Sequence, residues 1–223
     1  HHLYTLPTAL VSNTLDYGKF YIQETTEYMR QSLKVWAELG FSFDVVSTGM
    51  ILSAEQAALV SDFCEQSAKK GALVFVDPIM GDEGKLYNGV GEETVAHMRK
   101  IVPNYTEAAY LADMPYHEDM TEEEARALTI RLHEMGAKSV VVTSAKVDGE
   151  NCVVGYDGTE GEFFRIPFDL IPVRFVGTGD IFASVFSGLL LRGLSPDECA
   201  AAADEFVLHC IENTVGDEEH FYG

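Results

Sequence analysis

The sequence predicts an α/β fold in which a mostly parallel central sheet is covered by helices on both faces. Short runs rich in β-branched residues alternate with segments of helical pattern, which is typical of this class. The helical segments begin at capping residues and end at glycines. The chain has 223 residues, of which 47% are hydrophobic, and this is enough for one core. We therefore expect a single domain over residues 1–223.

The first strand–helix–strand unit lies in the first third of the chain. Residues 44–48 form an apolar strand pattern, after which Ser53 and Gln56 have the spacing of a capping box. Gly71 provides a helix stop, and residues 72–76 form the next strand. This order favours two neighbouring parallel strands.

A second unit follows the same pattern. Thr121 and Glu124 have capping-box spacing, Gly136 ends the helix, and residues 139–144 form a strand. Asp157-Gly158 then separates two further strand patterns, at 151–156 and 162–168, which predicts an antiparallel hairpin at the edge of the sheet. Ser195 and Pro196 begin a last long helix, with proline at its first position.

Composition excludes several classes of partner. The formal net charge of −21 would repel phosphate backbones and anionic lipid surfaces, so we expect neither a nucleic acid nor a membrane as partner. The four cysteines, at 64, 152, 199 and 210, include no Cys-x-x-Cys pair, which suits a reducing compartment. No apolar run approaches the roughly 20 residues that span a bilayer. We expect a cytoplasmic protein.

Polar residues follow the predicted strands, at the edge where open α/β sheets bind their ligands. The strand at 72–76 is followed by Asp77 and, around a turn at Gly81, by Asp82 and Lys85. Two carboxylates beside a basic side chain suit Mg²⁺ and phosphate. An ordinary polar loop is the alternative.

Two further segments supply polar groups of the same kind. Asn104 and Glu107 are three residues apart at the start of a helix and face one way; Asn104 could instead be only an N-cap, while Glu107 could hold a cation through water. Thr143 and Ser144 end the strand at 139–144 and carry hydroxyls that can donate to phosphate oxygens. As isolated features, they would more often be simple strand-end residues.

The sequence Gly-Thr-Gly-Asp at 177–180 stands directly before an apolar helix. Gly177 and Gly179 can adopt backbone angles forbidden to other residues, which would turn successive N–H groups toward one point as an anion cradle. The helix dipole would aim at the same point, where Asp180 could accept a proton from an attacking hydroxyl during phosphoryl transfer. The apolar face that would fix this helix comprises Phe182, Val185, Phe186 and Leu189. A glycine turn with an aspartate complementing a helix start is the purely structural alternative.

Together, these motifs resemble the pyridoxal kinase branch of the ribokinase-like superfamily. The resemblance is carried by VDPIMGD at 76–82, PNYTEA at 103–108, VVVTS at 140–144 and VGTGDIFAS at 176–184, in that order. It begins near LPTALVSN at 6–13 and covers most of the chain. The hydroxymethylpyrimidine kinases share parts of it.

The resemblance implies a ribokinase-like fold and an ATP-dependent, Mg²⁺-dependent kinase acting on the 5′-hydroxymethyl group of pyridoxal, pyridoxine or pyridoxamine, usually as a homodimer. Asp180 would be the catalytic base, with Gly177, Thr178 and Gly179 forming the anion hole. Asp82 and Glu107 would serve Mg²⁺. The ATP phosphates would be contacted by Asp77, Lys85, Asn104, Thr143 and Ser144. Ser12 and Tyr17 would contact the vitamer.

The chain departs from the family pattern at two places. Leu15 and Asp16 stand where relatives commonly carry a Thr-Gly pair before an aromatic residue. Relatives also have a strand, a serine loop and a helix before the position of Thr5, so we expect that the complete protein contains an N-terminal segment outside the 223 residues.

Two rival functions stay open. A hydroxymethylpyrimidine kinase would perform the same chemistry on a smaller ring. A non-catalytic binder of nucleotide or pyridoxal phosphate would need the cradle but not Asp180.

Overall fold

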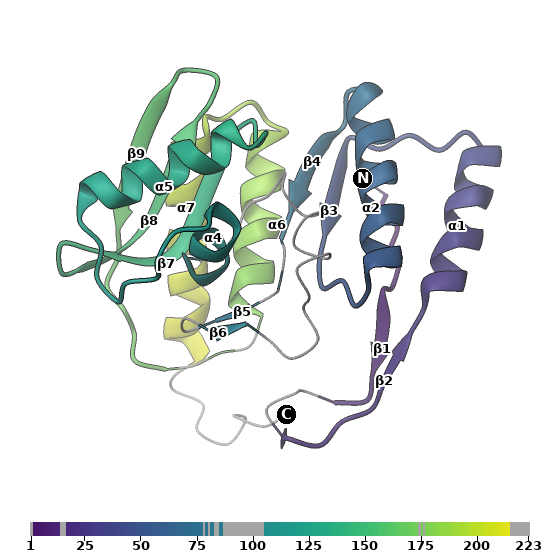
Figure 1. The fold of residues 1–223 in the computed structure, drawn as a ribbon, viewed down its shortest axis with the longest axis horizontal. Coiled ribbons are helices and arrows are strands. Elements are labelled where there is room, and N and C mark those ends of the chain that lie inside the picture. The colour runs from purple at the N-terminus through teal and green to yellow at the C-terminus, as the bar shows by residue number, and fades with distance from the viewer. Residues whose placement is uncertain are drawn as a thin grey trace.

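The computed structural model has α/β architecture, as the sequence predicts (Figure 1). It describes residues 2–13, 17–77, 79, 81–82, 85–86, 105–173, 175 and 177–214. None of the helices in these ranges is both long and apolar enough to cross a membrane.

An antiparallel arm and a helix form the first part of the chain. Strand β1 (Ala9–Val11) pairs with β2 (Ile22–Glu24), and α1 (Thr26–Glu38) follows directly. In Figure 1 the arm extends away from the body toward the lower edge of the view.

The predicted parallel unit is confirmed. Strands β3 (Val45–Thr48) and β4 (Leu73–Val76) pair in parallel, and α2 (Ala54–Lys69) connects them. Gly71 ends the helix region with φ of +97°, a backbone angle that suits glycine.

The remaining elements surround a three-stranded antiparallel sheet. Two short strands, β5 (Gly81–Asp82) and β6 (Lys85–Leu86), and two helices, α4 (Tyr105–Ala112) and α5 (Glu122–Glu134), precede it. The sheet has the order β7 (Val140–Val147), β8 (Glu150–Asp157) and β9 (Glu162–Pro167). Helices α6 (Thr178–Leu190) and α7 (Pro196–Thr214) follow.

The pairings and caps of this part agree with the sequence except at one turn. The Thr121–Glu124 capping box is formed in both directions, and the β8–β9 hairpin is antiparallel. The antiparallel pairing of β7 with β8 was not predicted. It depends on a tight turn at Asp148-Gly149, where both residues have positive φ.

Both faces of the antiparallel sheet are buried, because its side chains alternate between two core clusters. Val140 and Val142 point into the cluster shared with α4 and α5, whereas Val141 belongs to the cluster formed with α6 and α7. The same alternation continues on β8, where Val154 joins the first cluster and Val153 the second. Helices therefore cover both faces of the sheet, as predicted.

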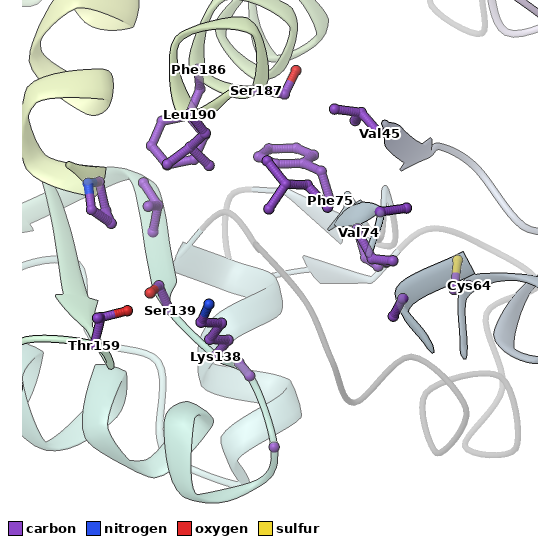
Figure 2. Close-up of a pocket in the computed structure, with 18 of the residues that line it drawn as sticks. Val45, Cys64, Val74, Phe75, Lys138, Ser139, Thr159, Phe186, Ser187 and Leu190 are labelled. Carbon is purple, nitrogen blue, oxygen red and sulfur yellow. The ribbon is translucent and has the colours of Figure 1, made fainter. Parts of the chain in front are cut away.

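A large cavity separates the β3–β4 pair from β7. It has a volume of about 1070 Å³. Figure 2 shows Val74 and Phe75 of β4, Ser139 directly before β7, and Phe186 and Leu190 of α6. Within the described residues, β4 pairs only with β3 and β7 only with β8 as neighbouring strands. The other edge of β7 is bridged only near its end, by Met120 at Val147.

The turn after β8 gives a test of packing. A Cβ atom on Gly158 would lie 1.9 Å from the carbonyl oxygen of Lys138 and 2.6 Å from a ring carbon of His133. Gly158→Ala should therefore lower the free energy of unfolding by about 2–3 kcal/mol. This corresponds to a fall of roughly 5–10 °C in Tm.

Gly188→Ala is the matched control. Gly188 lies within α6, and its added Cβ would meet nothing within 4 Å. It should leave Tm unchanged or raise it slightly, because alanine favours helix by about 0.5–1 kcal/mol. Equal melting temperatures for the two variants would contradict the close packing at Gly158.

Candidate functional site

The N-terminus of α6 is held by its buried face. Gly177 is the N-cap, with φ of +87°, and the helix begins at Thr178. Phe182 and Phe186 are 6% and 3% exposed, so packing of these side chains holds the first turn of α6 in a fixed direction. The left-handed backbone at Gly177 agrees with the prediction that this position needs glycine, and its role in an anion cradle stays a prediction.

Gly179 has a different role from the one predicted. It lies inside the first turn of α6 and does not have positive φ, so an unusual backbone angle is not its purpose. A Cβ at this position would meet nothing within 4 Å. Glycine here leaves open space beside the first N–H groups of the helix, where another molecule could approach closely.

Asp77 and Asp180 lie close enough to influence each other. Asp77 follows β4 and is partly buried, and Asp180 is exposed in the first turn of α6. Burial raises the pKa of Asp77 to about 6, and the negative charge of Asp180 adds to the rise, against a hydrogen bond that Asp77 Oδ1 accepts from the N–H of Ile79 at 3.3 Å. The structure thus brings together two acids that the sequence placed at separate motifs.

The backbone beside Asp77 is strained. Ile79 has φ of +42°, which is a rare conformation for a β-branched residue. No sequence signal indicated it. Ile79 also packs near Gly49, where a Cβ would lie 3.7 Å from its Cδ1 atom. The loop after β3 and the segment after β4 therefore meet at this point.

Thr143 and Ser144 lie at a β-bulge and not at the end of a strand. Strand β7 continues to Val147, and the register with β8 shifts between Val142 and Ala145. Ser144 has φ of +57° and is exposed, and Thr143 is half-buried. The bulge turns their backbone out of the ladder, as bulges near functional sites often do. The prediction that the strand ends at Ser144 was wrong, because pairing of β7 with β8 resumes at Ala145 after the bulge.

Glu107 is buried in the first turn of α4. It is 1% exposed, although its side chain carries a carboxyl group. A buried carboxylate is costly unless partners or a cation compensate for it. The Glu107 side chain takes part in a further interaction, and its role toward a cation stays a prediction.

Three predicted residues are described only in part or not at all. The backbones of Asp82 and Lys85 lie opposite each other in the β5–β6 pair, and their side chains are outside the description. Asn104 lies outside the described residues. Within the described residues, no group of three or more His, Cys, Asp or Glu side chains could hold a metal ion.

Ser12 and Tyr17 lie in the loop of the β1–β2 arm. The Ser12 hydroxyl accepts a hydrogen bond from the N–H of Tyr21 at 2.9 Å and donates to Asn13 Oδ1 at 2.6 Å, which closes the loop. Tyr17 is 59% exposed. Leu15 and Asp16 are outside the described residues. In Figure 1 the arm, the β5–β6 pair and the start of α6 all lie toward the lower edge.

The raised pKa of Asp77 predicts a pH dependence of stability in the metal-free protein. Asp77 keeps its proton up to about pH 6 when folded, whereas the unfolded chain releases it near pH 4. Its contribution to stability is therefore present at low pH and is lost as the pH rises from about 4 through about 6, by about 2–3 kcal/mol. Asp77→Asn should remove this part of the pH dependence in denaturant unfolding.

Asp204 on α7 provides the control, because burial raises its pKa to about 6 as well. Asp204→Asn should remove only its own contribution, and the Asp77 step should persist in that variant. If the free energy of unfolding depended on pH in the same way for wild type and Asp77→Asn, the raised pKa of Asp77, and with it the burial of Asp77 near Asp180, would be contradicted.

Several known kinases are similar to this chain in sequence. Human pyridoxal kinase is 31% identical over 200 residues, which are 78% of this chain and 62% of the relative. The hydroxymethylpyrimidine/phosphomethylpyrimidine kinase of Bacillus subtilis is 27% identical over 203 residues, 86% of this chain and 72% of the relative. The chain spans about half the length of several curated relatives, between 38% and 57%.

Solved structures share the fold. A Bacteroides thetaiotaomicron protein, described as a phosphomethylpyrimidine kinase and crystallised with pyridoxal, superposes with a TM-score of 0.88 at 34% identity. The match covers 96% of this chain and 78% of that one. This similarity in structure confirms the predicted ribokinase-like fold. The model of the phosphomethylpyrimidine kinase family matches residues 3–221, and the chain therefore belongs to this family.

Proposed function

We propose that the protein is an ATP-dependent kinase that phosphorylates the 5′-hydroxymethyl group of a vitamin B6 vitamer. The observation that carries the proposal is the start of α6, where Gly177 opens the helix N-terminus and Asp180 stands in the first turn beside the partly buried Asp77. The likeness to human pyridoxal kinase and to the Bacteroides structure with pyridoxal supports a B6 substrate.

Asp180 has the properties of a general base in this reaction. It is exposed, and so an acceptor hydroxyl can reach it. It would take the proton of the vitamer hydroxyl while the N–H groups at Gly177, Thr178 and Gly179 hold the oxygens of the transferring phosphoryl group. A pure binder would need the N–H groups but not the carboxylate, which argues against the non-catalytic alternative.

The acids of the site fit a divalent cation together with ATP. Asp77 and Glu107 are both withdrawn from solvent, and carboxylates beside ATP phosphates would repel them without a cation. Mg²⁺, when bound, would neutralise phosphate charge. Glu107 and Asp82 would hold it directly or through water, and Asp77, Lys85, Asn104, Thr143 and Ser144 would orient the phosphates.

The vitamer side of the proposal rests on the arm. Ser12 and Tyr17 would contact the ring, with the Ser12 hydroxyl already fixed by its loop. The same arm and α1 expose apolar side chains, among them Leu10, Tyr21 and Tyr28. We propose that this surface contributes to the homodimer.

The second candidate is a hydroxymethylpyrimidine kinase, which the family model and the Bacillus subtilis relative favour. A panel of pyridoxal, pyridoxine, pyridoxamine and hydroxymethylpyrimidine, each with ATP and Mg²⁺, separates the two in an ADP-release assay. We expect kcat/KM to be highest for a B6 vitamer. A higher value for hydroxymethylpyrimidine would assign the second function.

The cavity between β4 and β7 bears on the complete domain. Its walls are mainly apolar, although charged residues such as Lys69, Lys138 and Glu160 also line it, and the two strand edges that face it lack partners among the described strands. Free edges inside a domain leave backbone groups unsatisfied. We propose that an additional extended strand, from polypeptide outside the 223 residues, fills the cavity in the complete protein.

This proposal predicts the behaviour of the 223-residue chain. Expressed alone, it should melt with low cooperativity and lack kinase activity, because the cavity would stay open between the two strand pairs. Differential scanning calorimetry and the ADP-release assay test this, with the full-length protein as control. The proposal would be contradicted if the 223-residue chain were soluble, melted cooperatively and had kinase activity.

Asp180→Asn tests the catalytic base. The amide keeps the shape and a polar group at the helix start but cannot accept the proton, so kcat should fall on the order of 10²–10⁴-fold. The lower end is favoured because proton removal is late in a loose phosphoryl-transfer transition state. The measurement is steady-state kcat with pyridoxal in the full-length protein.

Two controls accompany this measurement. ATP affinity should change little, because the N–H groups at 177–179 remain. Tm should fall by no more than the equivalent of about 1 kcal/mol. An unchanged kcat in the folded variant would reject the role of Asp180 as base.

A further inference from the structure

The β1–β2 arm cannot fix its own position. Each strand has three residues, and most of their side chains are exposed. A two-stranded ribbon is marginal in isolation. The arm carries Ser12 and Tyr17, so whatever holds its root also sets where these two residues lie.

Gln56 lies at this root and is fully buried, with 0% of its surface exposed. Its Nε2 donates to the carbonyl oxygen of Thr8 at 2.7 Å, and its Oε1 accepts from the N–H of Leu52 at 3.0 Å. The sequence predicted a capping box with Ser53, and only half of it is formed. Ser53 accepts from the N–H of Gln56, but the Gln56 side chain turns to Thr8 and Leu52 instead.

Further bonds tie the same two segments together. Thr8 Oγ1 donates to the carbonyl oxygen of Met50 at 2.6 Å. On the second strand, Glu24 Oε1 accepts from the Ser53 hydroxyl at 2.6 Å. Both strands of the arm are therefore anchored to the loop between β3 and α2. Of these anchors, the Gln56 amide is the one that is completely buried and bonded at both ends.

The same loop adjoins the proposed active site. It follows Thr48, the last residue of β3, whose hydroxyl donates to the carbonyl oxygen of Asp77 at 3.5 Å. The next residue, Gly49, faces Ile79, and the N–H of Ile79 donates to the Asp77 carboxylate. A continuous path of contacts thus runs from the arm through residues 48–56 to Asp77, which senses the charge of Asp180.

We propose that Gln56 is a positioning residue for the acceptor substrate. By bridging Thr8 and Leu52, it holds the arm at a fixed place relative to Asp77 and Asp180. The proposal rests on the proposed function for its kinetic consequence, since Ser12 and Tyr17 are the residues taken to contact the vitamer. The bridge itself can be tested without any activity.

Gln56→Met keeps the length of the side chain but removes both hydrogen-bonding groups. Displacement of the arm should lower kcat/KM for the vitamer on the order of 10–10²-fold, because small misplacements of a reacting group are costly. KM for ATP should stay within about twofold of wild type, since no arm residue is assigned to the phosphates. A substitution that only destabilised the fold would reduce the amount of active enzyme, but it would not raise KM for the vitamer while leaving KM for ATP unchanged.

Gln56→Glu supplies a conservative rescue. A protonated glutamic acid can donate to Thr8 and accept from Leu52 as glutamine does, whereas the carboxylate cannot donate. Burial favours the protonated form. The ratio of kcat/KM for the vitamer between Gln56→Glu and wild type should therefore rise toward one as the pH is lowered, and Gln56→Met should show no such recovery.

Thr129→Val is the control for loss of a buried polar group. Thr129 is also 0% exposed, and its hydroxyl bonds only within α5, to the carbonyl oxygens of Ala125 and Arg126. It should leave both KM values unchanged. Hydrogen exchange provides the second readout: amides of residues 8–13 and 21–25 should exchange faster in Gln56→Met, whereas those of β7–β9 should not.

The outcomes separate the two proposals. Wild-type protein that phosphorylates no vitamer would reject the proposed function, and hydrogen exchange would still decide whether Gln56 anchors the arm. Two results would overturn the inference while the wild type is active. One is that Gln56→Met impairs the kinetic constants for the vitamer and for ATP equally. The other is that amide hydrogen exchange in the arm is the same in Gln56→Met as in wild type. Selective loss for the vitamer, pH-dependent rescue and faster exchange confined to the arm would support it.

Discussion

The burial of one face of α6 is the constraint on which the rest of the structure depends. Phe186 packs against Phe75 of β4, with ring centroids 5.8 Å apart, and the same core cluster includes Val141 of β7. The helix therefore shares one core cluster with both strands that border the cavity. Because its apolar face is fixed on both sides, its N-terminus is fixed too, and with it Gly177 and Asp180.

This arrangement places two acidic side chains, Asp77 and Asp180, close together, which costs free energy when both are ionised. Asp77 is held partly buried beside Asp180, and its pKa is raised as a result. Strain in the backbone at Ile79 accompanies this arrangement. Such local costs are typical of sites where a ligand supplies the missing compensation, because the surrounding packing holds groups in positions that they would not choose alone.

The two ends of the candidate site are built differently. The residues proposed to contact the phosphates belong to elements with extensive cores, α6 and the β7–β9 sheet. The segment proposed to contact the acceptor is an exposed ribbon that depends on a few hydrogen bonds at its root. Phosphoryl transfer needs the same phosphate geometry for every acceptor, whereas acceptor specificity can change through a peripheral segment. The contrast fits a family whose members act on different small rings.

The sequence by itself determined the features that depend on local signals. The Thr121–Glu124 capping box, the glycine stops at 71 and 136, and the β3–α2–β4 unit all follow from short-range backbone preferences. The helix after the Gly-Thr-Gly-Asp stretch was also predicted, although α6 begins earlier than expected, at Thr178. The motifs also indicated Asp77 and Asp180 separately. Only the tertiary structure decided what depends on contacts distant in sequence: the proximity of those two acids, the bulge at Thr143 and Ser144, the antiparallel pairing of β7, and the bridge from Gln56 to Thr8 across 48 positions. A local pattern specifies how a segment is shaped, but burial and partner geometry, which arise when segments pack, decide what each side chain does.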